Sequence, residues 1–173
     1  LKVVPKLSGF KPEYPDIRLS LTFTDRYVDL IEEGIDVAVR LGTLQDSSLI
    51  ARRLTTAQFN LVATPDYFAE HGRPRSLDDL AKHQCLAFTS RDTRLTRDWR
   101  FLAGGEETKL TPRGAMSFSD GGALCEAACA GYGLAQMHDY YLDHEIARGK
   151  LVPVLDKLKP PPDPIWLVYP PTR

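Results

Sequence analysis

Long apolar runs are missing from this 173-residue sequence. The longest uninterrupted apolar stretch is residues 165–169, far shorter than the ~20 residues that a membrane helix needs. No segment is therefore expected to span a bilayer. A secretory leader is also missing at the start, and the sequence resembles a fragment excised from a longer protein, so localisation has to be judged from other features.

Cysteine is scarce as well. The three cysteines, Cys85, Cys125 and Cys129, are an odd number, unlike the even and dense sets that staple small secreted domains. A disulfide framework is therefore excluded. We expect a reducing compartment, the cytoplasm.

Neither sign of charge is in excess. Lysine and arginine total 22 against 23 acidic residues, for a net charge of −1. A stand-alone DNA-binding module normally carries a clear excess of basic residues, so this sequence is not expected to bind nucleic acid by itself. Hydrophobic residues make up 43% and charged residues 26%, which is typical of a globular protein and excludes wholesale disorder.

The first part of the chain alternates between helical and strand periodicity. Apolar residues at three- and four-residue steps predict a helix over residues 4–14, ending near Pro12 and Pro15. Strict alternation predicts strands over 17–23 and 35–41. Between them Asp25 can cap a helix whose C-terminal residue is Gly34. Such short joints are typical of crossover units with parallel strands.

The middle of the chain is less regular. Residues 49–63 predict either two strands or one long bent strand. Short helices are expected from Pro65 and after the capping pair Ser76 and Asp79, followed by a strand at 85–88. Residues 90–113, with a pair of glycines at 104–105, predict a loose ribbon around Trp99 and Phe101.

The last part returns to alternating elements. Strands are predicted at 115–118, 134–137 and 165–169, and residues 151–155 are expected to be extended before a stiff linker at 160–162. Helices are predicted from Ser119 and Asp120 to Gly131, and from Asp139 through Ile146. Two small α/β lobes explain this order better than one sheet of about eight strands.

Short motifs along nearly the whole chain together form a recognisable pattern. They are YPDIRLSL at 14–21, DVAVR at 36–40, DSSLIARRL at 46–54, ATPDYF at 63–68, HG at 71–72, LDDL at 77–80, DGGAL at 120–124, GYGLA at 131–135 and VYP at 168–170. This pattern resembles the effector-binding domain of LysR-type transcriptional regulators.

The resemblance implies an α/β fold of two Rossmann-like lobes joined by a hinge, similar to type II periplasmic binding proteins. Lobe I would comprise residues 1–58 plus 161–173 and lobe II residues 59–160, with hinge crossovers near 54–60 and 151–164. The winged helix-turn-helix of the family is absent from this sequence. The sequence also lacks the strand that usually begins the family's domain and the helix that usually ends it.

Candidate effector-binding residues follow the rule that open α/β sheets bind ligands at the carboxyl ends of their strands. Ser119, Asp120 and Gly121 begin a helix, where free N–H groups and the helix dipole favour an anion. The alternative is a plain N-cap. Three further candidates of the same strand-end kind are Thr24, Thr89 and Ser90.

Two other positions carry more specific chemistry. Arg40 ends a predicted strand and can hold a carboxylate in bidentate fashion, or it can pair with Asp25 or Asp36 for structural reasons. Met137 and His138 end another strand, where the resemblance places a cleft-facing segment. An exposed histidine at a helix start is the alternative for His138. Solvated faces are the interpretation for the arginines at 52, 53, 91, 94, 97 and 100.

The helix predicted over 119–131 has two further features. Cys125 and Cys129 share one face, and they are interpreted as packed thiols or as a redox sensor, because two thiolates make a poor metal site. No metal is expected. The resemblance implies that this small-residue helix packs against the first helix of a neighbouring subunit, while packing on its own sheet is equally compatible. The candidate interface residues are Val4, Leu7, Phe10, Leu124, Ala127, Ala128 and Gly131.

The sequence therefore predicts a ligand-sensing module rather than an enzyme. No phosphate-binding glycine loop, nucleophile elbow or helix-borne zinc motif is present, so neither catalytic residues nor a cofactor are expected. A small molecule, which an anion would fit, is expected to bind between the lobes of a homodimer or homotetramer. DNA would be contacted only through residues outside this sequence. The alternative is an extracytoplasmic solute receptor of the same fold.

Overall fold

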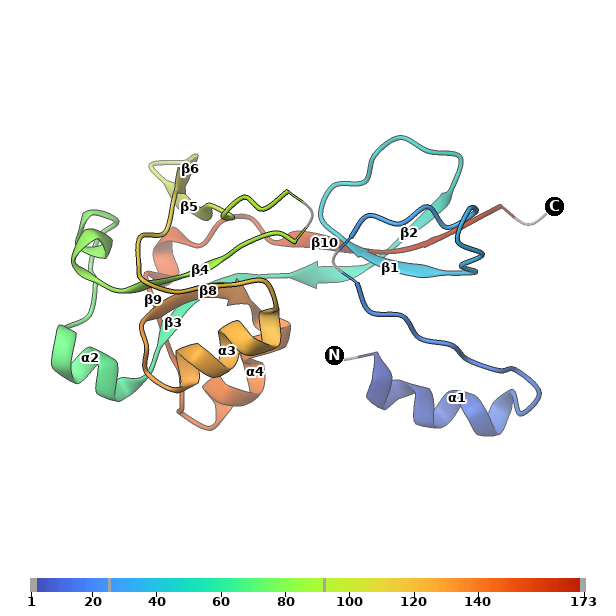
Figure 1. Cartoon of the computed structure of the whole chain (residues 1–173), viewed down its shortest axis with the longest axis horizontal. Coiled ribbons are helices and arrows are strands. Elements are labelled where there is room, and N and C mark those ends of the chain that lie inside the picture. Colours follow the sequence, from blue (N-terminus) through green and yellow to red (C-terminus); the bar gives the residue numbers. More distant parts are fainter. Residues whose placement is uncertain (1–2, 25, 92, 172–173) are drawn as a thin grey trace.

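A five-stranded sheet, a three-stranded sheet and a two-stranded hairpin organise the described residues, with helices packed mainly on the five-stranded sheet (Figure 1). A computed structural model describes residues 3–24, 26–91 and 93–171. None of the helices within these ranges has the length and apolar character of a membrane span. In chain order the elements are η1 (Val4–Lys6), α1 (Leu7–Glu13), β1 (Ala38–Leu41), β2 (Ile50–Ala57), β3 (Phe59–Ala63), α2 (Pro65–His71), η2 (Asp78–Lys82), β4 (Cys85–Phe88), β5 (Trp99–Ala103), β6 (Glu106–Leu110), β7 (Ser117–Phe118), α3 (Gly121–Cys129), β8 (Leu134–His138), α4 (Asp139–Ala147), β9 (Val152–Val154), η3 (Asp156–Leu158) and β10 (Asp163–Tyr169).

The larger sheet has five strands in the order β7-β4-β8-β3-β9. Strand β4 runs parallel to β7 and to β8, whereas β3 runs antiparallel to β8 and β9. Successive side chains of a strand point to opposite faces, and both faces of this sheet are buried. Leu61 packs in one apolar cluster and Val62 in another.

Different elements cover these two faces. Tyr67 and Phe68 of α2, Leu80 of η2, and Trp99 and Phe101 of the β5–β6 hairpin form the core on one side. Helix α3 and Leu142 of α4 form the core on the other side. The five-stranded half is therefore a three-layer unit with a complete core.

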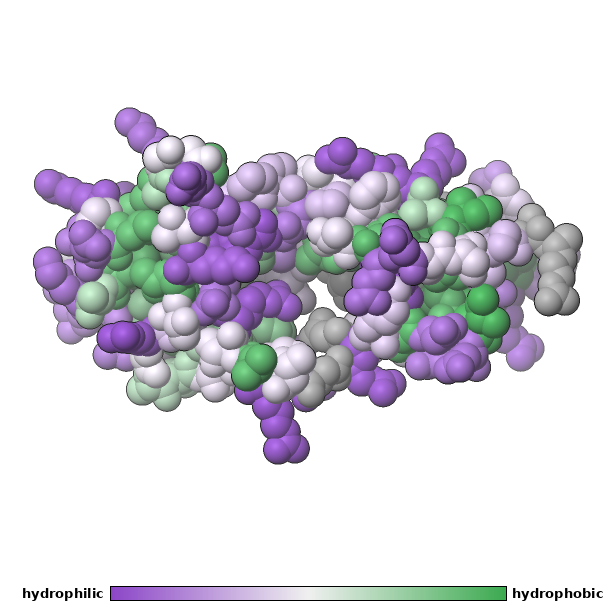
Figure 2. Space-filling view, turned by 90° about the horizontal axis from the view of Figure 1, so that it is seen from above, coloured by the Kyte–Doolittle hydropathy of each residue, from purple (hydrophilic) through white to green (hydrophobic). Residues whose placement is uncertain are grey.

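The smaller sheet has three antiparallel strands in the order β1-β10-β2. Its strands are more exposed than those of the five-stranded sheet, and Figure 2 shows hydrophobic side chains at the surface of both halves. Val39 is 52% exposed and Leu54 is 49% exposed. Leu30, at 1% exposure, is the well-buried apolar residue of the loop that precedes β1.

Three predictions for the first part of the chain are wrong. Residues 17–23 are extended but form no strand, because no neighbouring strand among the described residues pairs with them. The helix predicted after Asp25 is a single turn around Leu30 to Gly34, in which the Asp29 side chain accepts from the amides of the two residues after Leu30. Strand β1 pairs antiparallel with β10 rather than parallel within a crossover unit. Asp25 itself lies outside the described residues.

The residues predicted to begin or end helices are largely confirmed. Thr64 caps α2 through the amide of Tyr67 at 3.1 Å, and Gly34 has a left-handed φ of +65°. Ser76 and Asp79 exchange hydrogen bonds in the predicted way. The 49–63 stretch forms two strands, and the predicted ribbon is the β5–β6 hairpin.

Candidate functional site

The carboxyl ends of three strands meet at one edge of the five-stranded sheet. Because β4 is parallel to both β7 and β8, the residues that follow these strands lie along the same edge. The amide of Thr89 donates to the carbonyl of Phe118 at 2.8 Å, which continues the β4–β7 ladder to this point. The edge faces the three-stranded half in Figure 1, and the surface between the two halves is hollowed in Figure 2.

The predicted helix start at this edge is an N-cap. Asp120 turns its carboxylate back onto α3 and accepts from the amide of Ala123 at 2.9 Å, so the capping interpretation describes Asp120. Ser119 accepts a hydrogen bond from Nε of Arg91 at 3.4 Å. Gly121 is buried, and a Cβ there would overlap the ring of Tyr141. A side chain at position 121 would therefore require the Tyr141 ring to move.

Met137 and His138 are turned inward, into the five-stranded half. Met137 is 4% exposed and packs in the cluster beneath α3. The His138 ring stacks on Phe59 with a centroid distance of 3.7 Å, and its Nε2 lies 3.1 Å from a carboxylate oxygen of Asp163. The exposed helix-start alternative for His138 is thus wrong, because the side chain is 5% exposed. Both residues support the edge from behind.

The environment of His138 predicts sensitivity to acid. Burial lowers the pKa of His138 below its ordinary value, and Arg97 adds to this effect, while the hydrogen bond and charge of Asp163 and the charge of Asp139 oppose it. The unfolded chain therefore takes up this proton at a higher pH than the folded chain does. Stability from His138 is present above about pH 6.5 and is lost as the pH falls toward the lower folded pKa.

We expect the free energy of unfolding to fall between pH 7.5 and pH 5.5, and to fall less in His138→Gln, which keeps a donor for Asp163. Urea unfolding at both pH values measures the difference. Burial lowers the pKa of His83 too. The effect of His83 on stability is the same in the parent protein and in the His138→Gln variant. Equal losses in the two proteins would contradict the role given to His138.

Thr24 and Arg40 lie in the other half of the molecule. Thr24 is exposed and accepts from the amide of Arg26 at 3.1 Å. Arg40 donates to the carbonyl of Val28 at 2.6 Å, and its guanidinium lies 4.0 Å from the centroid of the Tyr27 ring. A carbonyl and a ring, and not Asp36, are the Arg40 partners that the described residues supply, and the other acid weighed for this role, Asp25, lies outside the described residues. Arg40 also borders an open pocket of about 210 Å³ lined further by Leu44, Gln45, Asp46, Ser47, Leu49, Ala51 and Val168.

The two cysteines of α3 are packed thiols. Cys125 is buried and donates to the carbonyl of Tyr141 at 3.5 Å. Burial and the neighbouring Cys129 raise the pKa of Cys125 to about 12. Burial also raises the pKa of Cys129, which is partly exposed. Because the thiolate is the reactive form, neither residue has the character of a fast redox sensor.

Thiol labelling tests this arrangement. At pH 7.5 in the folded protein, we expect a disulfide reagent such as DTNB to modify Cys129 first, and Cys125 and Cys85 only on unfolding. Cys129→Ser should remove the early phase, whereas Cys125→Ser should leave it. Rapid labelling that survives Cys129→Ser would show that the burial of the other thiols is wrong.

The interface residues predicted on α3 are mostly internal. Leu124, Ala127 and Ala128 are buried at 2%, 7% and 0% exposure in the core beneath this helix. Packing on its own sheet, the alternative left open above, therefore describes these three residues. Gly131 is half-buried. On the first helix Val4 is exposed, and Leu7 and Phe10 are half-buried.

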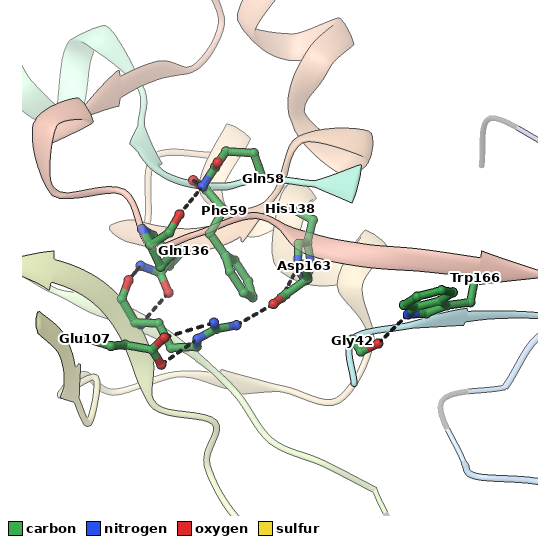
Figure 3. Close-up of polar contacts among 10 residues, drawn as sticks. Gly42, Gln58, Phe59, Glu107, Gln136, His138, Asp163 and Trp166 are labelled. Atoms are coloured by element: carbon green, nitrogen blue, oxygen red, sulfur yellow. Dashed lines mark hydrogen bonds and ion pairs between the residues drawn. The ribbon is translucent and has the colours of Figure 1, made fainter. Parts of the chain in front are cut away.

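Sequence reasoning missed a polar cluster beside this edge (Figure 3). Arg100, interpreted as a solvated residue, donates to Asp163 at 2.7 Å and to Glu107 at 3.0 Å. The side-chain amide of Gln136 bonds the backbone of Arg100 in both directions. No local sequence motif predicts the contact between Arg100 and Asp163, because these two residues are 63 positions apart in the sequence. Within the described ranges, no group of three or more His, Cys, Asp and Glu side chains is arranged to hold a metal ion.

Comparison with known proteins gives consistent matches. The family described as LysR substrate binding domain matches residues 2–173. The HTH-type transcriptional regulator CrgA of Neisseria meningitidis serogroup C is 41% identical over 154 residues, which are 88% of this chain and 50% of CrgA. The chain thus spans about half the length of the curated relatives it matches.

Solved structures agree with the sequence match. The regulatory domain of CrgA from Neisseria meningitidis superimposes with a TM-score of 0.84 at 35% identity, covering 97% of this chain and 81% of that chain. The regulatory domain of AphB from Vibrio vulnificus gives a TM-score of 0.83 at 31% identity, covering 96% and 82% respectively. The fold is therefore that of these regulatory domains.

Proposed function

Because the chain belongs to the LysR substrate binding domain family, we propose that it is the effector-sensing and oligomerisation domain of a LysR-type transcriptional regulator. One observation supports the position of the site: the carboxyl ends of β4, β7 and β8 share an edge that faces the three-stranded half. Ligands of open α/β sheets bind at such edges. The matched relatives are named transcriptional regulators, which does not favour the alternative of an extracytoplasmic receptor.

The proposed moving parts are two lobes. Lobe I comprises residues 1–58 and 161–173, lobe II comprises 59–160, and the crossovers lie near 54–60 and 151–164. The end of β2 and the start of β10 support this division, since they leave the three-stranded sheet side by side at Ala57 and Asp163. A ligand that contacts both lobes shifts their relative angle by as much as its affinity differs between the two arrangements.

The proposed ligand is a small molecule, and an anion fits the site best. Ser119 and the start of α3 would contact it from lobe II, together with Thr89, Ser90, Asp120 and Gly121. Thr24 and Arg40 would contact it from lobe I. Met137 and His138 would shape the site from behind, because both are buried. The proposed role is binding without catalysis, and no cofactor is assigned.

Assembly and DNA contact are proposed for the whole protein. DNA recognition would lie in residues outside this chain, because the curated relatives are about twice as long. A homodimer or homotetramer would use the Val4, Leu7 and Phe10 side of the first helix, with Gly131 near the end of α3. No membrane contact is proposed, and the free cysteines support a cytoplasmic location.

Calorimetric titration of site variants tests the proposed pocket. For the small carboxylate with the tightest binding, we expect Ser119→Ala to weaken affinity by about 2- to 10-fold and Arg40→Gln by about 10- to 100-fold. Ser20→Ala, a change in the exposed 17–23 segment, is the matched control and should bind as the parent does. Unchanged affinity in both site variants would contradict the proposed contacts.

A further inference from the structure

Strand β10 is held by side chains at both ends of its crossing between the two halves. At its start, Asp163 contacts residues of the five-stranded half. Three residues later, the Trp166 indole Nε1 donates to the carbonyl of Gly42 at 2.9 Å, in the loop after β1. Figure 3 shows the two anchors on the same strand.

The first anchor contains an ion pair between Asp163 and Arg100, which are both largely buried. Asp163 accepts from Nη1 of Arg100 at 2.7 Å through one oxygen, and its other oxygen lies 3.1 Å from Nε2 of His138. The side chains of Asp163 and His138 are 17% and 5% exposed. Burial opposes ionisation of Asp163, yet the hydrogen bonds from Arg100 and His138 hold its pKa below the ordinary value. Charge-assisted bonds of this kind are stronger than neutral ones.

Arg100 is itself fixed before it meets Asp163. Its Nε and Nη2 donate to the two carboxylate oxygens of Glu107 at 3.0 and 3.2 Å. Its backbone amide donates to Gln136 at 2.8 Å, and its carbonyl accepts from Gln136 at 2.7 Å. The Arg100 side chain therefore loses little conformational entropy when its guanidinium binds Asp163.

The strand is irregular between its two anchors. Its register with β2 shifts between Ile165 and Trp166, which is a β-bulge or an equivalent irregularity. Such a feature bends a strand and increases its local twist. The irregularity therefore lies between Asp163, which is bound to the five-stranded half, and Trp166, which is bound to the three-stranded half.

We propose that Asp163 is a positioning residue that sets the angle between the two halves, by tying the start of β10 to Arg100 and His138. This inference rests on the proposed two-lobe sensing function and deepens it, because the effector must work against or with this contact when the lobes move. Breaking the contact frees β10 to pivot at the bulge and populates a wider range of lobe angles.

Electron–electron distance measurement between two spin labels tests the proposal. The labels are attached at Arg52→Cys on β2 and Glu126→Cys on α3, both exposed positions, in a Cys129→Ser background. We expect Asp163→Asn to widen the distance distribution at least twofold. Asp98→Asn is the matched control, since it makes the same chemical change at a carboxylate that accepts from Thr111 at 2.6 Å and not from Arg100, and it should leave the width unchanged.

Two further variants keep the test decisive if Asp163→Asn folds poorly. Arg100→Gln and His138→Leu each remove one bond to Asp163 and should widen the distribution. Adding Asp163→Asn to the double variant Arg100→Gln, His138→Leu should widen it no further. Unchanged widths in these variants, or equal widening by Asp98→Asn, would overturn the role of Asp163. No ligand enters the experiment, so its failure leaves the sensing proposal standing, and failure of ligand binding leaves the width result intact.

Discussion

Gly133→Ala is expected to lower the free energy of unfolding by about 3 kcal/mol, since backbone strain and overpacking each cost about 1–3 kcal/mol. Gly133 has a φ of +157° and lies between α3 and β8. A Cβ at this position would overlap the carbonyl oxygen of Gln84 and lie 3.0 Å from its carbonyl carbon. That carbonyl accepts the first bond that joins β8 to β4, from the amide of Leu134 at 2.8 Å, so neither partner can move away freely.

Gly149→Ala is the matched control for this variant. Gly149 also has a positive φ, +71°, but no heavy atom lies within 4 Å of the Cβ that alanine would add. Its loss should be limited to the left-handed strain of about 1–2 kcal/mol. Chemical denaturation of both variants gives the comparison. Equal losses would show that the close approach of Gly133 to Gln84 has no energetic weight.

Gln136→Met is expected to destabilise the protein by a similar amount. The Gln136 side chain is the hydrogen-bond partner of both the amide and the carbonyl of Arg100, and the residue is 8% exposed. Methionine has nearly the same length and no hydrogen-bonding group of comparable strength. The variant therefore leaves two backbone groups unpaired, each at a cost of about 1–3 kcal/mol.

The loss should be accompanied by local loosening of the hairpin. We expect faster hydrogen exchange in β5 and β6 than in β3, because Gln136 joins the hairpin to the sheet. Gln45→Met, the same chemical change at an exposed position, should alter stability by less than about 0.5 kcal/mol. A Gln136→Met protein as stable as Gln45→Met would refute the proposed weight of these two bonds.

The five-stranded half was predictable because its signals are local. Alternating residues such as Leu61 and Val62 face two different apolar clusters, so period two in the sequence corresponds to a sheet buried on both faces. Thr64 and Asp120 cap the helices that they precede. Strand pairing and capping here depend on residues that the chain itself supplies.

The first part of the chain was harder to predict because a strand needs a partner. Residues 17–23 alternate as a strand does, but Leu21 is 51% exposed and Phe23 is 62% exposed. Without a paired neighbour in the described residues, the segment is extended and not part of a sheet. The helix expected before β1 reduces to one turn, since Leu30 alone packs deeply there.

The placement of the strand-end candidates in the fold was predictable, and their side-chain contacts were less so. Strand-end reasoning brought Thr89 and Ser119 to one edge, and the family resemblance is confirmed by the match over residues 2–173. The inward turn of His138 depends on Asp163, 25 residues further along the chain. Arg100 and Asp163 lack any local pattern, because only the folded chain brings the hairpin and β10 together.

Thermal unfolding of the protein against small carboxylates, aromatic acids, quinones and amino acids tests the central claim most directly. A ligand at 100 times its dissociation constant adds ~2.7 kcal/mol to the stability of the folded state. The sensing role predicts that at least one class raises the unfolding temperature, with a smaller rise in Ser119→Ala. A panel in which no compound shifts the transition, or in which Ser119→Ala responds as the parent does, would contradict a sensing cleft at this edge.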